Sequence, residues 1–149
     1  MKIKFAFAIS FSGNFEFKHF GEADKYLIYE WNEQKFQLVK ELLNAHKNLK
    51  EEQAHGLLKK GNAIIELLLK ENVQVLVSKQ FGTNIQLINR WFVPVIIDNE
   101  TPSEAIKKIE NSIMWIEEEL SRETQGFKLF TLKTGTLKSI ITNKPNYEE

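Results

Sequence analysis

The feature that most constrains the fold is a change of hydrophobic period between the two halves of the chain. In the first half, residues 3–9 and 35–43 alternate apolar with small or polar side chains, the two-residue period of β-strands. Residues 25–31, between them, are rich in aromatic and β-branched residues, which also favour strands. Short links between these three runs predict an antiparallel start to a sheet.

The second half mixes helical stripes with short β-branched runs. Residues 61–72 carry apolar side chains at helical spacing, and residues 83–91 predict a second, shorter helix. Residues 73–77 and 93–97 are typical of short buried strands. The last helix begins with the start signal Thr101-Pro102-Ser103-Glu104, and its apolar stripe comprises Ile106, Ile109, Ile113, Ile116 and Leu120.

The predicted order is therefore β-β-β-α-β-α-β-α, and strand signals return at residues 127–133 and 136–141 around the turn Thr134-Gly135. This order predicts an α/β fold with a mixed five-stranded sheet and helices on both faces. We expect the first strand beside the fourth, as in ribonuclease-H-like domains. The chain would then comprise an α/β domain over residues 1–122 and a C-terminal β-hairpin extension over residues 123–149.

Composition excludes several kinds of site and partner. The chain has 149 residues, a formal net charge of zero and no cysteine. Disulfides, thiolate-bound zinc and iron–sulfur clusters held by this chain's own cysteines are therefore excluded. The neutral charge balance argues against nucleic acid as a partner. No run reaches the roughly 20 apolar residues of a membrane span, and the N-terminus lacks signal-peptide features, so we expect a cytoplasmic protein without a membrane partner.

Two loops should form a crevice where strands end. In open α/β sheets, ligands bind beyond the carboxyl ends of the strands, here between Ser10-Phe11-Ser12-Gly13 and Gln80-Phe81-Gly82-Thr83-Asn84. A helix start and close backbone approach at Gly82 favour an anion there. Ordinary turns explain the same residues without any ligand. The candidate binding residues in these loops are Ser10, Ser12, Gly13, Gly82, Thr83 and Asn84.

The triplet His19-Phe20-Gly21 is the most distinctive candidate. It lies between two predicted strands, so it places a titratable side chain beside a glycine at the rim of the sheet. His19 could ligate a metal, donate a hydrogen bond to an anion, or bond a turn carbonyl as a structural histidine. The other histidines, His46 and His55, fall on a predicted surface connection, where solvation is the simpler interpretation.

The sequence offers no support for catalysis. It contains no metalloprotease helix, P-loop, Rossmann glycine fingerprint or nucleophile elbow. A ribonuclease-H-type nuclease needs several carboxylates on its strands, yet residues 3–9 contain none. Glu30 and Asp98, at the ends of other strands, do not build a two-metal site. We therefore expect a binding protein rather than an enzyme.

Three segments carry a resemblance to a known family. They are the opening Met1-Lys2-Ile3-Lys4-Phe5-Ala6, the segment His19-Phe20-Gly21-Glu22-Ala23 leading into Tyr26-Leu27-Ile28-Tyr29-Glu30, and residues 73–97 with Phe81-Gly82. Over about residues 1–119, the chain resembles the dinitrogenase iron–molybdenum cofactor biosynthesis family, the nitrogenase accessory factor-like domains. The resemblance implies a ribonuclease-H-like fold and non-catalytic binding or carriage of iron–sulfur or iron–molybdenum clusters. Matched by position, His19 is the motif histidine, and Gly21 and Gly82 are its glycines.

Two functions follow as hypotheses. The first is a cofactor carrier in which His19 is the metal ligand, Phe20 and Gly21 line the site, and backbone donors of the two loops contact the cluster's sulfides. Without cysteine, such a site would bind its cluster transiently. The second is a cofactor-free interaction module. Its C-terminal hairpin is apolar on both faces, so it should pack on the core or pair with a second copy or a partner protein.

Overall fold

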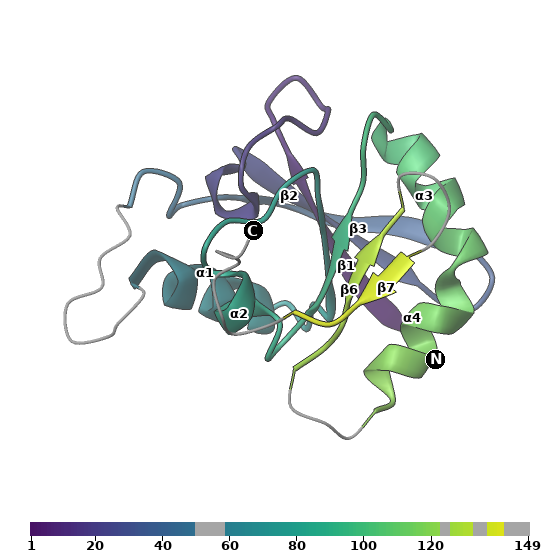
Figure 1. Ribbon diagram of the computed structural model, residues 1–149. Helices are drawn as coiled ribbons and strands as arrows, with labels where there is room; N and C mark the ends of the chain where they lie inside the picture. Colours follow the sequence, from purple (N-terminus) through teal and green to yellow (C-terminus); the bar gives the residue numbers. More distant parts are fainter. Residues whose placement is uncertain (50–58, 123–125, 133–136, 142–149) are drawn as a thin grey trace.

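A computed structural model describes residues 1–49, 59–122, 126–132 and 137–141. Within these ranges, seven strands form one mixed sheet in the order β3-β2-β1-β4-β5-β6-β7 (Figure 1). The strands are β1 (Ile3–Ile9), β2 (Lys25–Trp31), β3 (Phe36–Leu43), β4 (Val75–Ser78), β5 (Val93–Ile96), β6 (Leu129–Thr131) and β7 (Leu137–Ser139).

Helices cover both faces of this sheet (Figure 1). The helices α1 (Lys59–Leu69) and α2 (Ile85–Ile88) pack on one face, and α3 (Pro102–Asn111) and α4 (Ile113–Leu120) pack on the other. The predicted start of the last helix is confirmed, because Thr101 and Glu104 form a reciprocal capping box. The apolar stripe expected on one helix is shared by α3 and α4, since the buried Ser112, with a φ of −112°, interrupts the helix.

The central strand β1 is buried on both faces. Its four large side chains belong to the core under α3 and α4, where burial of each one stabilises the fold by roughly 1.5–3 kcal/mol. These four are Ile3, Phe5, Phe7 and Ile9. Ala6 and Ala8 belong to the other core, under α1, which they share with the larger Phe20 and Tyr26. The alternation of large and small residues in β1 thus places the large side chains in one core and the small ones in the other.

The pairing of the first four strands agrees with the prediction. β1 pairs with β2, and β2 with β3, in antiparallel fashion, while β1 pairs with β4 in parallel. The first strand therefore lies beside the fourth, as expected. The sheet has seven strands where five were expected, because β6 joins β5 in parallel and β7 joins β6. The likeness to ribonuclease-H-like sheets stays a prediction.

The C-terminal strands β6 and β7 are antiparallel neighbours that extend the sheet beyond β5. Phe130 and Leu132 are fully buried in the core under α3 and α4. The segment therefore packs on the chain's own core, one of the two outcomes that its apolar faces predicted. The expected turn Thr134-Gly135 lies outside the described residues, and the domain boundary at residue 123 stays a prediction.

A buried carboxylate ties this segment to α4. Glu119 is fully buried, and its Oε2 accepts a hydrogen bond from the backbone N–H of Lys128 at 2.8 Å. Arg122 forms an ion pair with the same carboxylate, and Lys138 Nζ of β7 lies 3.2 Å from its Oε1. Because a buried carboxylate needs such partners, Glu119 couples the position of β6 and β7 to that of α4.

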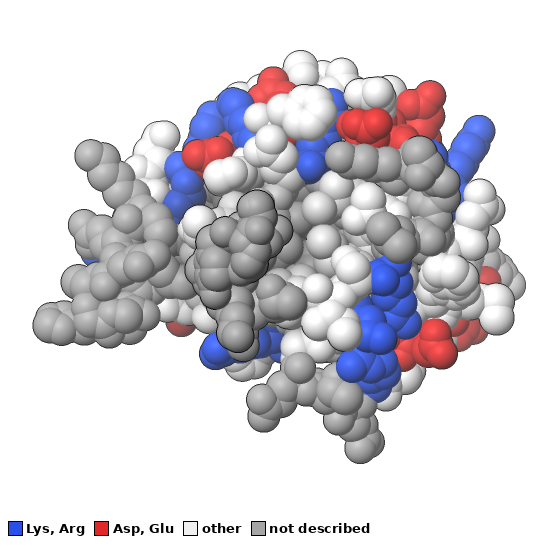
Figure 2. Space-filling model, in the orientation of Figure 1, with Lys and Arg blue, Asp and Glu red and all other residues white. Residues whose placement is uncertain are grey.

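Charges on the surface are mixed. On the face seen in Figure 2, acidic and basic side chains lie next to one another, in keeping with the formal net charge of zero. None of the helices in the described part of the chain has the length and apolarity of a membrane span. The expectation that nucleic acid is not a partner stays a prediction.

Candidate functional site

A cleft of about 380 Å³ lies between the loop that follows β1 and the loop that follows β4. One wall is formed by residues 19–22, which include the 3₁₀ turn η1 (Phe20–Glu22). The opposite wall is formed by residues 82–84, and the lining is completed by residues 47–49, by α1 and by Ile88 of α2. The cleft therefore lies on the face of the sheet that α1 and α2 cover.

The imidazole of His19 lies against the backbone at Gly82. An isolated parallel bridge between His19 and Gln80 brings the two loops together. A Cβ atom on residue 82 would lie 2.6 Å from His19 Nδ1, a distance that real Cβ contacts almost never show, and 3.0 Å from Cγ. Glycine at 82 is thus what leaves room for the ring. The His19 side chain is exposed and lines the cleft, so it can reach a ligand there.

Two further glycines permit close packing around the cleft. A Cβ atom on Gly21 would lie 2.9 Å from Ile64 Cδ1 of α1, and one on Gly61 would lie 3.0 Å from Asn84 Cγ. Gly61 thereby lets the first turn of α1 approach Asn84, which precedes α2. The absence of side chains at these positions allows the walls of the cleft to lie close together.

Two buried side chains hold the backbone of the His19 loop. The amide Nδ2 of Asn44 donates to the carbonyl oxygens of Gly21 and Ala23, each at 2.9 Å. The Tyr26 hydroxyl donates to the carbonyl oxygen of Phe20 at 2.9 Å, and burial raises the pKa of Tyr26, so the donor stays protonated. Three carbonyls within four residues are therefore satisfied by side chains of β2 and of the segment after β3, which rigidifies this wall.

Stacked aromatic rings connect the two walls. The Phe20 ring lies 4.8 Å from that of Tyr26 and 5.7 Å from that of Phe81, measured between centroids, and both pairs are stacked. Phe81 precedes Gly82, so the stack runs from the core through η1 to the loop after β4. A shift of either loop would disturb contacts worth about 0.5–1.5 kcal/mol for each aromatic pair.

Charged groups give the cleft a positive side. Lys47 and Lys60 both contribute to its lining, and Glu22 is the acidic residue among the lining side chains. Lys60 Nζ donates to the Lys47 carbonyl oxygen at 3.0 Å, which joins α1 to the segment after β3. Lys47 forms an ion pair with Asp24. The hydrogen bond from Lys47, together with that from the Phe11 N–H, lowers the pKa of the Asp24 carboxyl.

Six of the nine predicted binding residues meet in this cleft. They are His19, Phe20, Gly21, Gly82, Thr83 and Asn84. The remaining three, Ser10, Ser12 and Gly13, do not line it. Their hydroxyls bond within the loop: Ser10 Oγ lies 2.6 Å from Ser12 Oγ and donates to the Asn14 carbonyl, and Gly13 takes a φ of +95° in the turn. Residues of α1 line the cleft in place of Ser10–Gly13.

Sequence reasoning missed Asn44, Lys47, Lys60 and Gly61. Gly61 carried a usable signal, since glycine near the start of a helix suggests close approach of another segment. Asn44 and Lys47 follow a surface strand and resemble ordinary turn residues, so no local signal marks them. His46 does not line the cleft, although its N–H donates to Asn44 Oδ1 at 3.0 Å, and His55 lies outside the described residues.

The side chains of the cleft suit a weakly held ligand better than a resident metal centre. In the described ranges, no three His, Asp or Glu side chains converge as a metal site needs, and the whole chain has no cysteine. His19 is the imidazole available in the lining, and the two lysines favour an anion. A cluster could thus take one nitrogen ligand here, and its remaining contacts would be hydrogen bonds and charge interactions.

Comparison with known proteins places the chain in a family. No curated protein matches it significantly. The family profile described as "Dinitrogenase iron-molybdenum cofactor" matches residues 1–112, which include β1 to β5, α3 and every described wall of the cleft. The match covers most of the chain, and it includes the His19 and Gly82 loops on which the resemblance rested. The chain therefore belongs to the dinitrogenase iron–molybdenum cofactor family.

Proposed function

We propose that this protein is a non-catalytic carrier that binds an iron–sulfur or iron–molybdenum cluster transiently in the cleft. The observation that supports this most directly is the His19 imidazole, seated against Gly82 and open to the cleft. Membership of a family associated with the iron–molybdenum cofactor makes a metal cluster the natural cargo. In this proposal His19 supplies the one side-chain ligand to the metal.

The charge of the cleft agrees with an anionic cargo. Lys47 and Lys60 both line the cleft, and their positive charges would attract the sulfides or carboxylates of a cluster, with that of Lys47 shared with Asp24. A single imidazole without thiolates gives weak attachment, because structural metal centres use about four protein ligands. Weak attachment suits a protein that receives a cluster from one partner and releases it to another.

The absence of catalysis is part of the proposal. Among the described residues, no hydrogen bond joins His19 to a serine or threonine hydroxyl, so the cleft offers no activated nucleophile. The cytoplasmic location expected from the sequence also belongs to the proposal. The cluster is cargo here, and the protein's task is to bind it, shield it and let it go.

Anaerobic loading tests the proposal. The full chain is incubated with extracted iron–molybdenum cofactor or with a thiolate-ligated iron–sulfur cluster, unbound cluster is removed by gel filtration, and retained iron and molybdenum are measured. We expect the wild type and His46→Ala to retain metal and His19→Ala to lose it, because His46 lies outside the cleft lining. Equal retention by His19→Ala and wild type would refute the role of His19. No retention by the wild type would refute the carrier function.

A cofactor-free interaction module is the alternative function. It is favoured by the C-terminal segment, which follows the family match and leaves Ile140 exposed by 73% beside the edge strand β7. An exposed edge strand with an apolar side chain can pair with a second copy or a partner protein. Sedimentation equilibrium of the full chain and of Ile140→Lys tests the homodimer, and a monomer in both cases would contradict it.

A further inference from the structure

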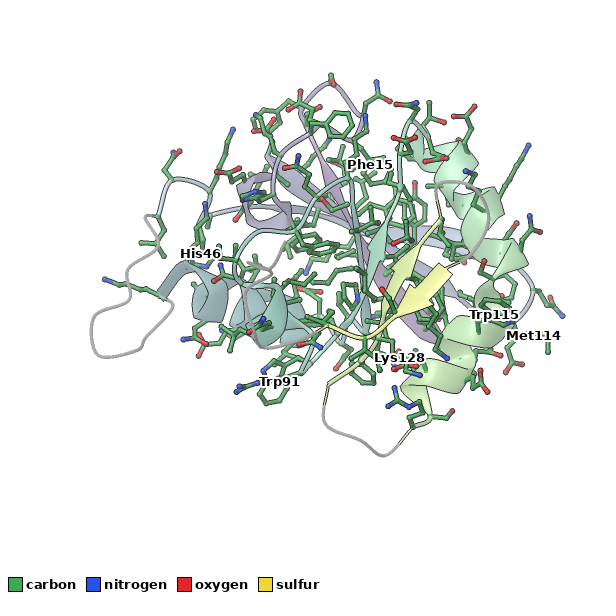
Figure 3. The ribbon with its side chains drawn as sticks, viewed as in Figure 1. Phe15, His46, Trp91, Met114, Trp115 and Lys128 are labelled. Atoms are coloured by element: carbon green, nitrogen blue, oxygen red, sulfur yellow. The ribbon has the colours of Figure 1, made fainter. Side chains whose placement is uncertain are left out.

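The outer side of α4 carries two exposed apolar residues that the fold does not use. Met114 is 75% exposed and Trp115 is 49% exposed, and Figure 3 shows both at the outer edge of the molecule, away from the sheet. Ile116, the next residue, is fully buried and fixes the helix on the core. Tryptophan and methionine are enriched at protein interfaces, and tryptophan is among the commonest binding hot spots.

This surface is separate from the cleft. The family match ends at residue 112, immediately before α4 begins at Ile113, so Met114 and Trp115 belong to the part of the chain that the family profile does not include. In addition, α4 packs on the face of the sheet opposite to α1 and the cleft (Figure 1). A partner bound at α4 would therefore leave the cleft accessible.

The charges around the two residues define the partner. Residues 110–120 contain four glutamates, of which Glu119 is buried and paired with Arg122 and Lys138, so the other three supply the acidic surface. Glu117 and Glu118 follow Met114 by three and four positions in α4, so they flank it on the helix surface, and Glu110 lies in the last turn of α3. Among the described residues, no ion pair neutralises Glu110 or Glu117, whereas Glu118 lies 3.6 Å from Lys138. An apolar spot with acidic neighbours fits a surface that is apolar and basic.

We propose that the face of α4 formed by Met114 and Trp115 binds a basic amphipathic segment of a partner protein. Apolar side chains of that segment contact Met114 and Trp115, and its lysines or arginines lie opposite Glu110 and Glu117. A second copy of the chain would place glutamates against glutamates, and an anionic membrane would also be repelled. The partner is thus a protein, recognised by its apolar and basic side chains.

Fluorescence anisotropy with two synthetic helical peptides tests this proposal. One probe is built from leucine and lysine, and the other has glutamate in place of every lysine. We expect the full chain to bind the lysine probe, more weakly as ionic strength rises from about 0.05 to about 0.3 M, and not to bind the glutamate probe. The double variant Met114→Ser/Trp115→Ser should weaken binding about tenfold or more.

Two further variants locate the binding surface. Glu110→Lys/Glu117→Lys should also lose the lysine probe, because it reverses the charge without touching the apolar side chains. Trp91→Ser is the matched control, since Trp91 is 52% exposed and lies far from α4 in Figure 3. Met114, Trp115 and Trp91 are exposed, whereas Glu110 and Glu117 are partly buried, so circular dichroism checks that each variant stays folded.

Three results would overturn the proposal. They are equal loss of binding in Trp91→Ser and Met114→Ser/Trp115→Ser, equal binding of the two probes, and a dimer of the wild type that Met114→Ser separates in sedimentation. The third result would make a second copy the occupant. None of these measurements depends on a bound cluster, so the docking surface and the carrier function succeed or fail separately.

Discussion

Replacing Gly82 by alanine should displace the His19 imidazole and change the stability of the fold only slightly. The new Cβ would lie 2.6 Å from His19 Nδ1, while ordinary van der Waals contact begins at 3.4 Å, so the ring must withdraw by about 0.8 Å or more. The backbone tolerates alanine, because the φ of Gly82 is not positive. His19 is exposed, and rotating its side chain away should cost roughly 0.5–1.5 kcal/mol.

The expected outcome is a folded protein that no longer holds its cargo. A binding group must stay within about 0.5 Å of its productive position, so a displacement of this size should lower metal retention to the level of His19→Ala. Three measurements follow the change: urea unfolding for stability, retained iron and molybdenum after anaerobic loading, and the imidazole resonances of His19 in NMR spectra. We expect a small change in the first and a large one in the other two.

Gly13→Ala is the matched control, because it should lower the stability of the fold and leave metal retention unchanged. Gly13 has a φ of +95° and nothing within 4 Å of the added Cβ, so alanine would be strained but would touch no neighbour. The strain should destabilise the fold by roughly 1–2 kcal/mol without changing metal retention, since Gly13 does not line the cleft. If Gly82→Ala keeps both the wild-type resonances and the wild-type retention, the steric argument is wrong.

Three further predictions concern the supports of the cleft and the sheet. Asn44→Ala removes the donor for two carbonyls of the His19 loop and should destabilise the protein by about 1–3 kcal/mol in urea unfolding; a change below about 0.5 kcal/mol would contradict the network. Phe130→Ala should cost about 3–5 kcal/mol, because Phe130 is fully buried, and wild-type stability would show that the C-terminal strands are dispensable. Burial alone would raise the pKa of Glu100, but hydrogen bonds from Lys108 and from the Asp98 N–H outweigh it and lower that pKa. The stability that the ionised Glu100 contributes is therefore complete above its ordinary pKa of 4.5 and is lost as the pH falls through the lowered value. The difference in unfolding free energy between wild type and Glu100→Gln should thus shrink on acidification. A difference that stays constant with pH would refute this role of Glu100.

Local sequence patterns were sufficient to predict most of the helices and strands. The alternation in β1 and the capping box at Thr101 both follow from interactions within a few residues, and both were predictable. The pattern could not reveal that Ser112 interrupts the last helix, because the stripe of buried residues continues across the break. It also could not show that β6 would join β5, since pairing with the core and pairing with another chain bury the same apolar faces.

For the site, the sequence alone marked residues 19–21 and 82–84, because a histidine beside a glycine at a strand end and a glycine at a helix start are local features. The tertiary structure decided which other residues meet them. Lys47 and Lys60 reach the cleft from segments far away in the sequence, and Asn44 supports its wall from behind, whereas Ser10–Gly13, the nearer loop, does not line it. Hydrophobic period determines which face of an element is buried, but contacts between distant segments depend on how the whole sheet and its helices pack, and no local pattern records that.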